Sequence, residues 1–168
     1  MIARLLRHLA QAFALFGAAV ALGVAALTVV SVVLRALTTQ PIQGDVELAQ
    51  FGIALAISMA VPWCQLRGAN IIVDFFTQRL PAASIRRLDG VGALLIAAMF
   101  ALLGWRTGVG AFAVHAAGET SMIRGLPMWW VYAMLAPGLA LAAWIAALQG
   151  WLQLRGRSLD ALRGGVPA

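Results

Sequence analysis

The stretch LAQAFALFGAAVALGVAALTVVSVVL, residues 9–34, decides the fold of this 168-residue chain. It contains no charged side chain and lies between His8 and Arg35. A helix needs about 20 apolar residues to cross a hydrocarbon layer of about 30 Å, so this stretch predicts a membrane-spanning helix. It lacks a small-residue cleavage pattern, and we therefore expect the span to be retained rather than removed as a secretory signal.

Three further apolar runs of spanning length follow along the chain. They cover residues 48–66, 90–113 and 128–154. Only Arg106 places a charge inside one of these runs, and Pro127 stands at the expected first turn of the last helix, where its missing N–H is not required. None of the runs alternates polar and apolar residues, which excludes a membrane barrel. The sequence therefore predicts an all-α integral membrane protein, with residues 1–168 forming one domain of four transmembrane helices.

The composition agrees with a membrane protein. Apolar residues make up 62% of the chain and charged residues 11%, against about 45–50% and 25% in soluble domains. The net charge is +6, and all 12 basic residues are arginine. No arginine run is longer than two residues and none lies on a polar domain, so the charge does not indicate nucleic-acid binding.

The arginines predict the orientation of the spans. Nine fall on one side of the four spans: Arg4, Arg7, Arg67, Arg79, Arg86, Arg87, Arg155, Arg157 and Arg163. Three fall on the other side: Arg35, Arg106 and Arg124. Basic residues in short loops favour the cytoplasmic side, so we predict that both termini are cytoplasmic. Trp63 and Trp151 at the cytoplasmic ends, and Trp105, Trp129 and Trp130 at the outer ends, fit two interfacial belts.

The connection between the second and third spans has a pattern of its own. On a helical wheel, residues 70–80 place apolar side chains on one arc and polar ones, including Asp74, on the opposite arc. Pro81 ends the pattern. We predict a short amphipathic helix at the cytoplasmic interface, packed either on lipid or on the base of the bundle.

The sequence offers little chemistry for catalysis. Cys64 is the single cysteine, and His8 and His115 lie at opposite membrane faces, so they cannot hold a haem or a metal together. The acids Asp45 and Glu47 form too short and isolated a pair for phosphotransfer or proteolysis. We expect no catalytic, substrate-binding or metal site and no cofactor, and therefore no enzyme.

Three features are candidates for contacts with a partner or with lipid. Arg106 either extends its charge to the outer headgroups or forms a buried pair with Glu119 or with an acid of another subunit. Glu47 either solvates the outer start of the second span or stabilises that helix N-terminus through its dipole. Small residues four apart let helices approach closely in lipid, and the ridge of Gly138, Ala142, Ala146 and Gly150 is the leading candidate for an inter-subunit seam. Shorter ridges are Gly17, Ala21, Ala25 and Gly104, Gly108.

Three patches of sequence resemble the small membrane subunit of tripartite ATP-independent periplasmic (TRAP) transporters of the C4-dicarboxylate type. The first contains Pro41-Ile42 and then Glu47-Leu48; the second contains Arg67-Gly68, Ile71-Ile72-Val73-Asp74 and Leu80-Pro81; the third contains Gly118–Ser121, Pro127, Trp129, Tyr132 and Pro137. The family usually has a histidine before the Ile-x-Val-Asp core, where this chain has Asn70. Asparagine can still cap the expected amphipathic helix.

The resemblance implies a multi-pass protein of the bacterial inner membrane with two protein partners. A large elevator-type membrane subunit would carry the substrate and sodium sites, and a periplasmic substrate-binding protein would deliver an organic acid. The small subunit would be a non-catalytic scaffold in contact with membrane lipids. A stand-alone small transporter or channel is the alternative. The residues expected to contact the partner or lipid are Arg35, Glu47, Arg67, Asp74, Arg106, Glu119, Gly138, Ala142, Ala146 and Gly150.

Overall fold

The computed structural model of the chain describes residues 2–38, 42–68 and 81–156. These form four helices: α1 (Ile2–Thr38), α2 (Asp45–Arg67), α3 (Ala82–Ala117) and α4 (Trp129–Leu154). All four are long and apolar enough to cross a membrane. The predicted all-α membrane fold is confirmed. The amphipathic helix predicted over residues 70–80, with Asp74, lies outside the described residues.

The helices extend beyond the apolar runs that predicted them. α1 begins at Ile2, before the apolar run 9–34, and α3 begins at Ala82, before the apolar run 90–113. Arginine has nearly the helix propensity of leucine, so a helix can continue through the charged flanks of a span. α4 begins later than expected: Pro127 is not in its first turn but pairs with Thr120 in an isolated antiparallel bridge.

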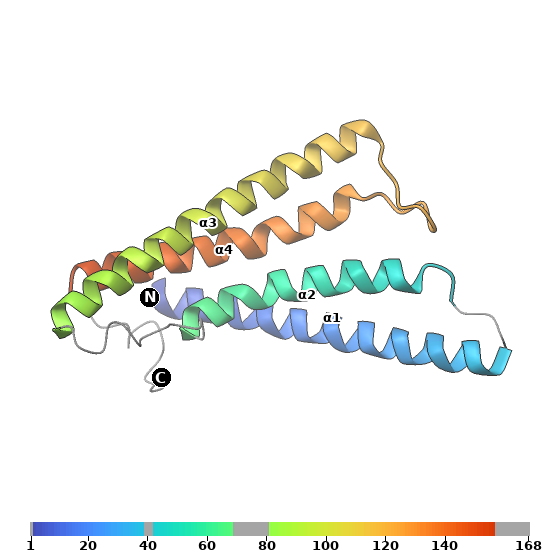
Figure 1. The fold of residues 1–168 in the computed structure, drawn as a ribbon, viewed down its shortest axis with the longest axis horizontal. Coiled ribbons are helices and arrows are strands. Elements are labelled where there is room, and N and C mark those ends of the chain that lie inside the picture. The colour runs from blue at the N-terminus through green and yellow to red at the C-terminus, as the bar shows by residue number, and fades with distance from the viewer. Residues whose placement is uncertain (1, 39–41, 69–80, 157–168) are drawn as a thin grey trace.

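The helices pack as two antiparallel hairpins (Figure 1). α1 packs on α2 and α3 on α4, while α2 and α4 join the two hairpins. We call the end where α1 begins and α4 ends the terminal end, and the opposite end, with the α1–α2 and α3–α4 connections, the loop end. The hairpins lie side by side toward the terminal end and diverge toward the loop end (Figure 1).

Glycines allow close approach within each hairpin. A Cβ atom on Gly17 of α1 would lie 2.8 Å from the carbonyl oxygen of Ala56 on α2. A Cβ atom on Gly150 of α4 would lie 2.9 Å from the carbonyl oxygen of Gly90 on α3. Both distances are shorter than a real Cβ contact, so only glycine permits these backbone approaches.

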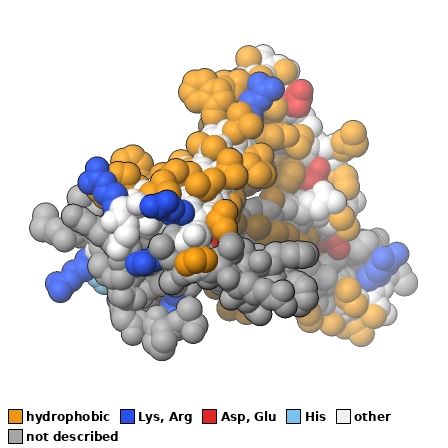
Figure 2. Space-filling model, turned by 60° about the vertical axis from the view of Figure 1, so that its left-hand side comes forward, with side chains coloured by type: hydrophobic (Ala, Val, Ile, Leu, Met, Phe, Trp, Pro, Cys, Tyr) orange, Lys and Arg blue, Asp and Glu red, His pale blue; other side chains and the backbone are white. Residues whose placement is uncertain are grey.

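The buried core is small, and the outer surface is apolar. Ala10, Leu66 and Ile145 bring α1, α2 and α4 together in one buried cluster. Large apolar side chains such as Leu22, Leu95 and Phe112 are exposed along the helices. In water such a surface would be costly, whereas in a bilayer it faces acyl chains. Figure 2 shows this apolar covering along the helices and arginine side chains gathered at the end of the molecule turned forward, which is the terminal end.

Candidate partner and lipid interface

A pair of buried glutamines joins the two hairpins near the terminal end. Nε2 of Gln65 on α2 donates to Oε1 of Gln149 on α4 at 2.8 Å. Nε2 of Gln149 donates in turn to the backbone carbonyls of Gln65 at 2.9 Å and of Leu66 at 3.2 Å. Both side chains are buried. Because lipid offers no hydrogen-bond partners, such amides are stable in a membrane only when the protein satisfies them.

A second polar contact joins α2 and α4 nearer the middle of the bundle. Oγ of Ser58 donates to the carbonyl oxygen of Leu135 at 2.7 Å. That carbonyl lies two residues before Pro137, inside α4. Gly138 faces the same serine, and a Cβ atom there would lie only 2.3 Å from the carbonyl oxygen of Ser58. The absence of a side chain at Gly138 therefore permits the hydrogen bond.

The small-residue ridge of α4 is an internal seam. Gly138, Ala142, Ala146 and Gly150 are all buried within the chain itself. Gly138 packs on Ser58 of α2, and Gly150 packs on Leu94 and Gly90 of α3. The prediction that this ridge forms an inter-subunit seam is therefore wrong. Close helix approach in lipid needs small residues equally within one chain and between chains, so the spacing alone did not distinguish the two cases.

The shorter ridges are divided between internal and open positions. Gly17 and Gly104 face α2 and α4, respectively. Ala21 and Ala25 are exposed, and a Cβ atom on Gly108 would meet no other atom within 4 Å. Each of these ridges therefore has one end inside the chain and one end at its surface.

At the loop end, Glu47 contacts the α3–α4 connection. Its Oε2 accepts a hydrogen bond from the backbone N–H of Arg124 at 3.3 Å. Nε of Arg124 donates to the carbonyl oxygen of Gln43 at 2.9 Å. The connection is itself folded, since the N–H of Ser121 donates to the carbonyl oxygen of Leu126 at 2.8 Å. These contacts join the two hairpins again where the helices have diverged.

Arg35 lies at the α1–α2 connection. It is in the last turn of α1 and exposed. In the same region Oγ of Ser31 donates to Oδ2 of Asp45, the first residue of α2, and the N–H of Val46 donates to Oδ1 of Asp45 at 2.8 Å. Asp45 therefore joins the start of α2 to α1 through Ser31, a role that was not predicted for it from the sequence.

The remaining candidate residues lie at the surface. Arg106 and Glu119 are exposed, and within residues 81–156 the structure does not join them in an ion pair. Arg67 is exposed, and its guanidinium carbon lies 4.7 Å from the ring centroid of Trp63. A cation above an indole face is attracted by the ring quadrupole, which orders this side chain at the terminal end.

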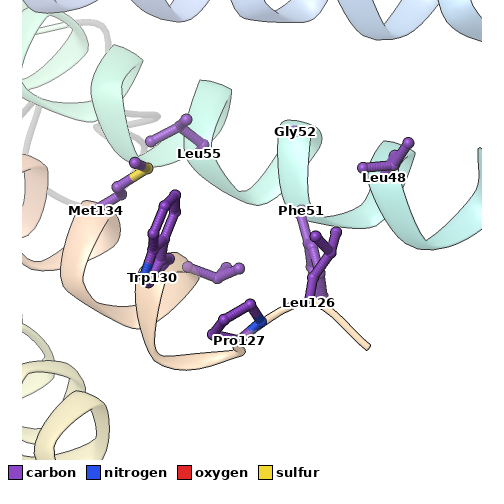
Figure 3. A pocket seen from close by; sticks show the side chains of 9 residues that line it. Leu48, Phe51, Gly52, Leu55, Leu126, Pro127, Trp130 and Met134 are labelled. Atoms are coloured by element: carbon purple, nitrogen blue, oxygen red, sulfur yellow. The ribbon is translucent and has the colours of Figure 1, made fainter. Parts of the chain in front are cut away.

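An apolar groove lies between α2 and α4 where the hairpins diverge (Figure 3). Its volume is about 340 Å³. Leu48, Phe51, Gly52 and Leu55 line it from α2, and Leu126, Pro127, Trp130, Val131 and Met134 line it from the opposite side. The lining contains no charged side chain. Its side chains are apolar apart from the indole N–H of Trp130, so the lining favours an apolar occupant.

The described residues contain no group of three histidine, cysteine or acidic side chains close enough to hold a metal ion. The polar residues that the sequence analysis missed are Gln65, Gln149 and Ser58. Their signal was present, because glutamines within apolar runs must find a partner in the membrane. The predicted sites included charged side chains within the spans but no neutral amides.

Comparison with known proteins identifies the family. Residues 24–156, most of the chain, match the family described as tripartite ATP-independent periplasmic transporters, DctQ component. No curated protein and no solved structure shows significant similarity to the chain. The match covers all three sequence patches that resembled the small TRAP subunit. The four apolar helices and this match together show that the chain belongs to the DctQ family, and that it is a multi-pass inner-membrane subunit of a TRAP transporter.

Proposed function

We propose that this chain is the static scaffold of its transporter and carries no substrate site of its own. The family is a transporter component family rather than an enzyme family. In this proposal a large elevator-type subunit performs sodium-coupled uptake of an organic acid such as a C4-dicarboxylate, which a periplasmic binding protein delivers. The small subunit holds the stationary part of the large subunit in place.

The use of buried polar groups carries the proposal. The buried amides of Gln65 and Gln149 bind each other and the α2 backbone, and Ser58 binds the α4 backbone. A transport site needs polar groups directed at a ligand, whereas the side chains of Gln65, Gln149 and Ser58 form hydrogen bonds between α2 and α4. Arg106 is the single charge inside the four apolar runs, and it is exposed on α3. These features favour a rigid support over a conducting or binding subunit.

We also propose that the terminal end faces the cytoplasm. Arg4, Arg7, Arg67, Arg86 and Arg155 lie at the terminal end, and Arg35 and Arg124 lie at the loop end. This distribution supports a cytoplasmic terminal end. The Glu47 and Arg124 contact would then face the periplasm, on the side where the binding protein docks.

Uptake measured in proteoliposomes tests the scaffold. The large subunit and binding protein are reconstituted with the chain, without it, and with the chain as the only membrane protein. We expect sodium-dependent uptake only when all three components are present. Full uptake without the chain would remove the scaffold role, and uptake by the chain alone would support the alternative of a stand-alone transporter.

A further inference from the structure

Three arginines line a groove between the start of α3 and the end of α4. The groove has a volume of about 430 Å³, within the range of about 300–1,000 Å³ typical of small-molecule pockets. Its lining consists of Arg86, Arg87, Gln153, Leu154, Arg155 and Gly156. It lies at the terminal end, far from the apolar groove of Figure 3.

The backbone builds this groove. A Cβ atom on Gly90 would lie 2.9 Å from Cγ of Leu154, so a glycine there allows the end of α4 to rest directly on α3. Gly156 has φ +70° and donates its N–H to the carbonyl oxygen of Gln153 at 3.0 Å, which turns the chain at the end of α4. A residue with a side chain adopts this conformation only at a cost. The groove therefore follows from two glycines at fixed positions.

The charges of the groove are not neutralised within the described chain. Arg86, Arg87 and Arg155 are all exposed, and none forms an ion pair with a carboxylate of the described residues. Asp89 follows Arg86 by three residues, a spacing at which side chains can meet on a helix, but within residues 81–156 the two form no ion pair. The guanidinium carbon of Arg155 lies 4.0 Å from the ring centroid of Trp151, which fixes one charge in place. The planar donor forks of arginine match the oxygens of a phosphate group.

Apolar side chains continue from the groove along both helices. On α3, Val91 follows Arg87 by one turn and is 49% exposed, and Leu95 follows by another turn at 65%. On α4, Trp151 precedes Arg155 by one turn and Trp144 lies two turns farther along; they are 44% and 62% exposed. Residues at these spacings share a helix face. A free phosphate would use only the arginines, whereas a phospholipid would use the arginines and both stripes.

We propose that this groove is a binding site for the phosphate headgroup of an anionic phospholipid, whose acyl chains lie along α3 and α4. The site is independent of the transport role proposed above and of the direction in which the terminal end faces. Bound lipid would join the start of α3 to the end of α4 through one phosphate.

Native mass spectrometry of the full chain in neutral detergent tests the site. The chain is titrated with phosphatidylglycerol and, separately, with phosphatidylcholine of the same acyl composition. We expect a one-to-one phosphatidylglycerol adduct and much weaker phosphatidylcholine binding. Arginines near an anionic surface contribute about 1 kcal/mol each, so the R86Q/R87Q/R155Q variant should bind phosphatidylglycerol on the order of a hundredfold more weakly.

The matched control is R4Q/R7Q, which removes two charges from the same end outside the groove and is compared with R86Q/R87Q, which removes two charges from the groove. R4Q/R7Q should keep the adduct nearly unchanged. The single variants R86Q and R155Q keep the test usable if the triple glutamine variant does not fold. Equal losses in R4Q/R7Q and R86Q/R87Q would show diffuse attraction rather than a site and overturn the proposal, as would unchanged binding in R86Q/R87Q/R155Q.

Inorganic phosphate distinguishes the source of the anion. It is added in large excess to the lipid-bound chain before the measurement. Retention of the phosphatidylglycerol adduct supports a lipid site that depends on the acyl chains as well as on the phosphate. Displacement of the lipid by inorganic phosphate would instead assign the groove to a soluble anion and overturn the lipid proposal.

Discussion

Gln65 and Gln149 form a reciprocal pair: each side-chain amide donates to the residue opposite, Gln65 to the side-chain oxygen of Gln149 and Gln149 to the backbone oxygen of Gln65. The pair joins one helix of each hairpin, and it lies near the terminal end, where the hairpins are side by side (Figure 1). Because the third bond of Gln149 reaches Leu66, the amide also holds the last turn of α2. This contact fixes the angle between the hairpins at one end while they diverge at the other.

Replacing either glutamine of this pair by leucine should destabilise the chain, because the buried partner then loses the hydrogen bond between the two side chains. Interhelical hydrogen bonds in membranes contribute about 0.6 kcal/mol on average and up to about 1.7, so we expect a coupling energy of about 1 kcal/mol between Q65L and Q149L. Reversible unfolding of both single variants and the double variant in mixed micelles measures it.

The exposed Gln50 of α2 provides the matched control for this cycle. Q50L should leave the free energy of unfolding nearly unchanged. If the losses of Q65L and Q149L simply add in the double variant, the hydrogen bond between the two side chains does not contribute to joining the hairpins.

Adding one methyl group at Gly138 should separate α2 from α4. A Cβ atom there would lie 2.3 Å from the carbonyl oxygen of Ser58, so G138A forces the helices apart and weakens the bond from Ser58 to Leu135. Overpacking of this kind costs about 1–3 kcal/mol. A lower temperature of thermal inactivation and a lower yield of monomer, measured by heating in detergent followed by size-exclusion chromatography, would be the result.

Gly92 offers the opposite case on α3. A Cβ atom there would meet no other atom within 4 Å, and alanine is the better helix former by about 1 kcal/mol. G92A should therefore match or exceed the wild type in the same assay. Equal behaviour of G92A and G138A would mean that Gly138 does not govern the α2–α4 distance.

Removing the carboxylate of Glu47 should loosen the α3–α4 connection. Glu47 accepts from the backbone N–H of Arg124, and an exposed contact of this kind contributes about 0.5–1 kcal/mol. Trypsin cleavage after Arg124 should therefore be about two to five times faster in E47A. E47Q retains an acceptor oxygen and should be cleaved at close to the wild-type rate, as should E119A on the same connection. Unchanged cleavage of E47A would show that this contact does not hold the connection.

The fold could be predicted from the sequence because one physical requirement dominates it. A charge-free run such as residues 9–34 must be helical in lipid, since only a helix satisfies its own backbone there. The residues at which the helices begin and end could not be predicted as closely. α3 begins at Ala82 rather than near residue 90, because helical hydrogen bonding continues through Arg86 and Arg87 beyond the apolar run.

The packing within the bundle could not be predicted from spacing. The ridge that includes Ala142 and Ala146 has the pattern of a helix–helix seam, but the pattern does not say which helix covers it. The contact of Glu47 with Arg124 depends on a turn over residues 118–128 that brings together side chains far apart in the sequence. Hydrophobic periodicity carries no information about such a turn.

Arg106 should influence assembly rather than substrate affinity. It is exposed on α3 between Trp105 and Val109, which are 70% and 45% exposed, so its charge stands on an otherwise apolar face. A guanidinium in this position is stable if it reaches the headgroups or an acid of another subunit. If the small subunit holds no substrate site, R106A should lower the yield of the complex with the large subunit and reduce uptake in proportion, while the apparent affinity for substrate stays constant. Co-purification and uptake kinetics on the same preparations measure both, with R106K as the charge-retaining control. A changed apparent affinity at normal complex yield would place Arg106 in the transport path and contradict the scaffold proposal.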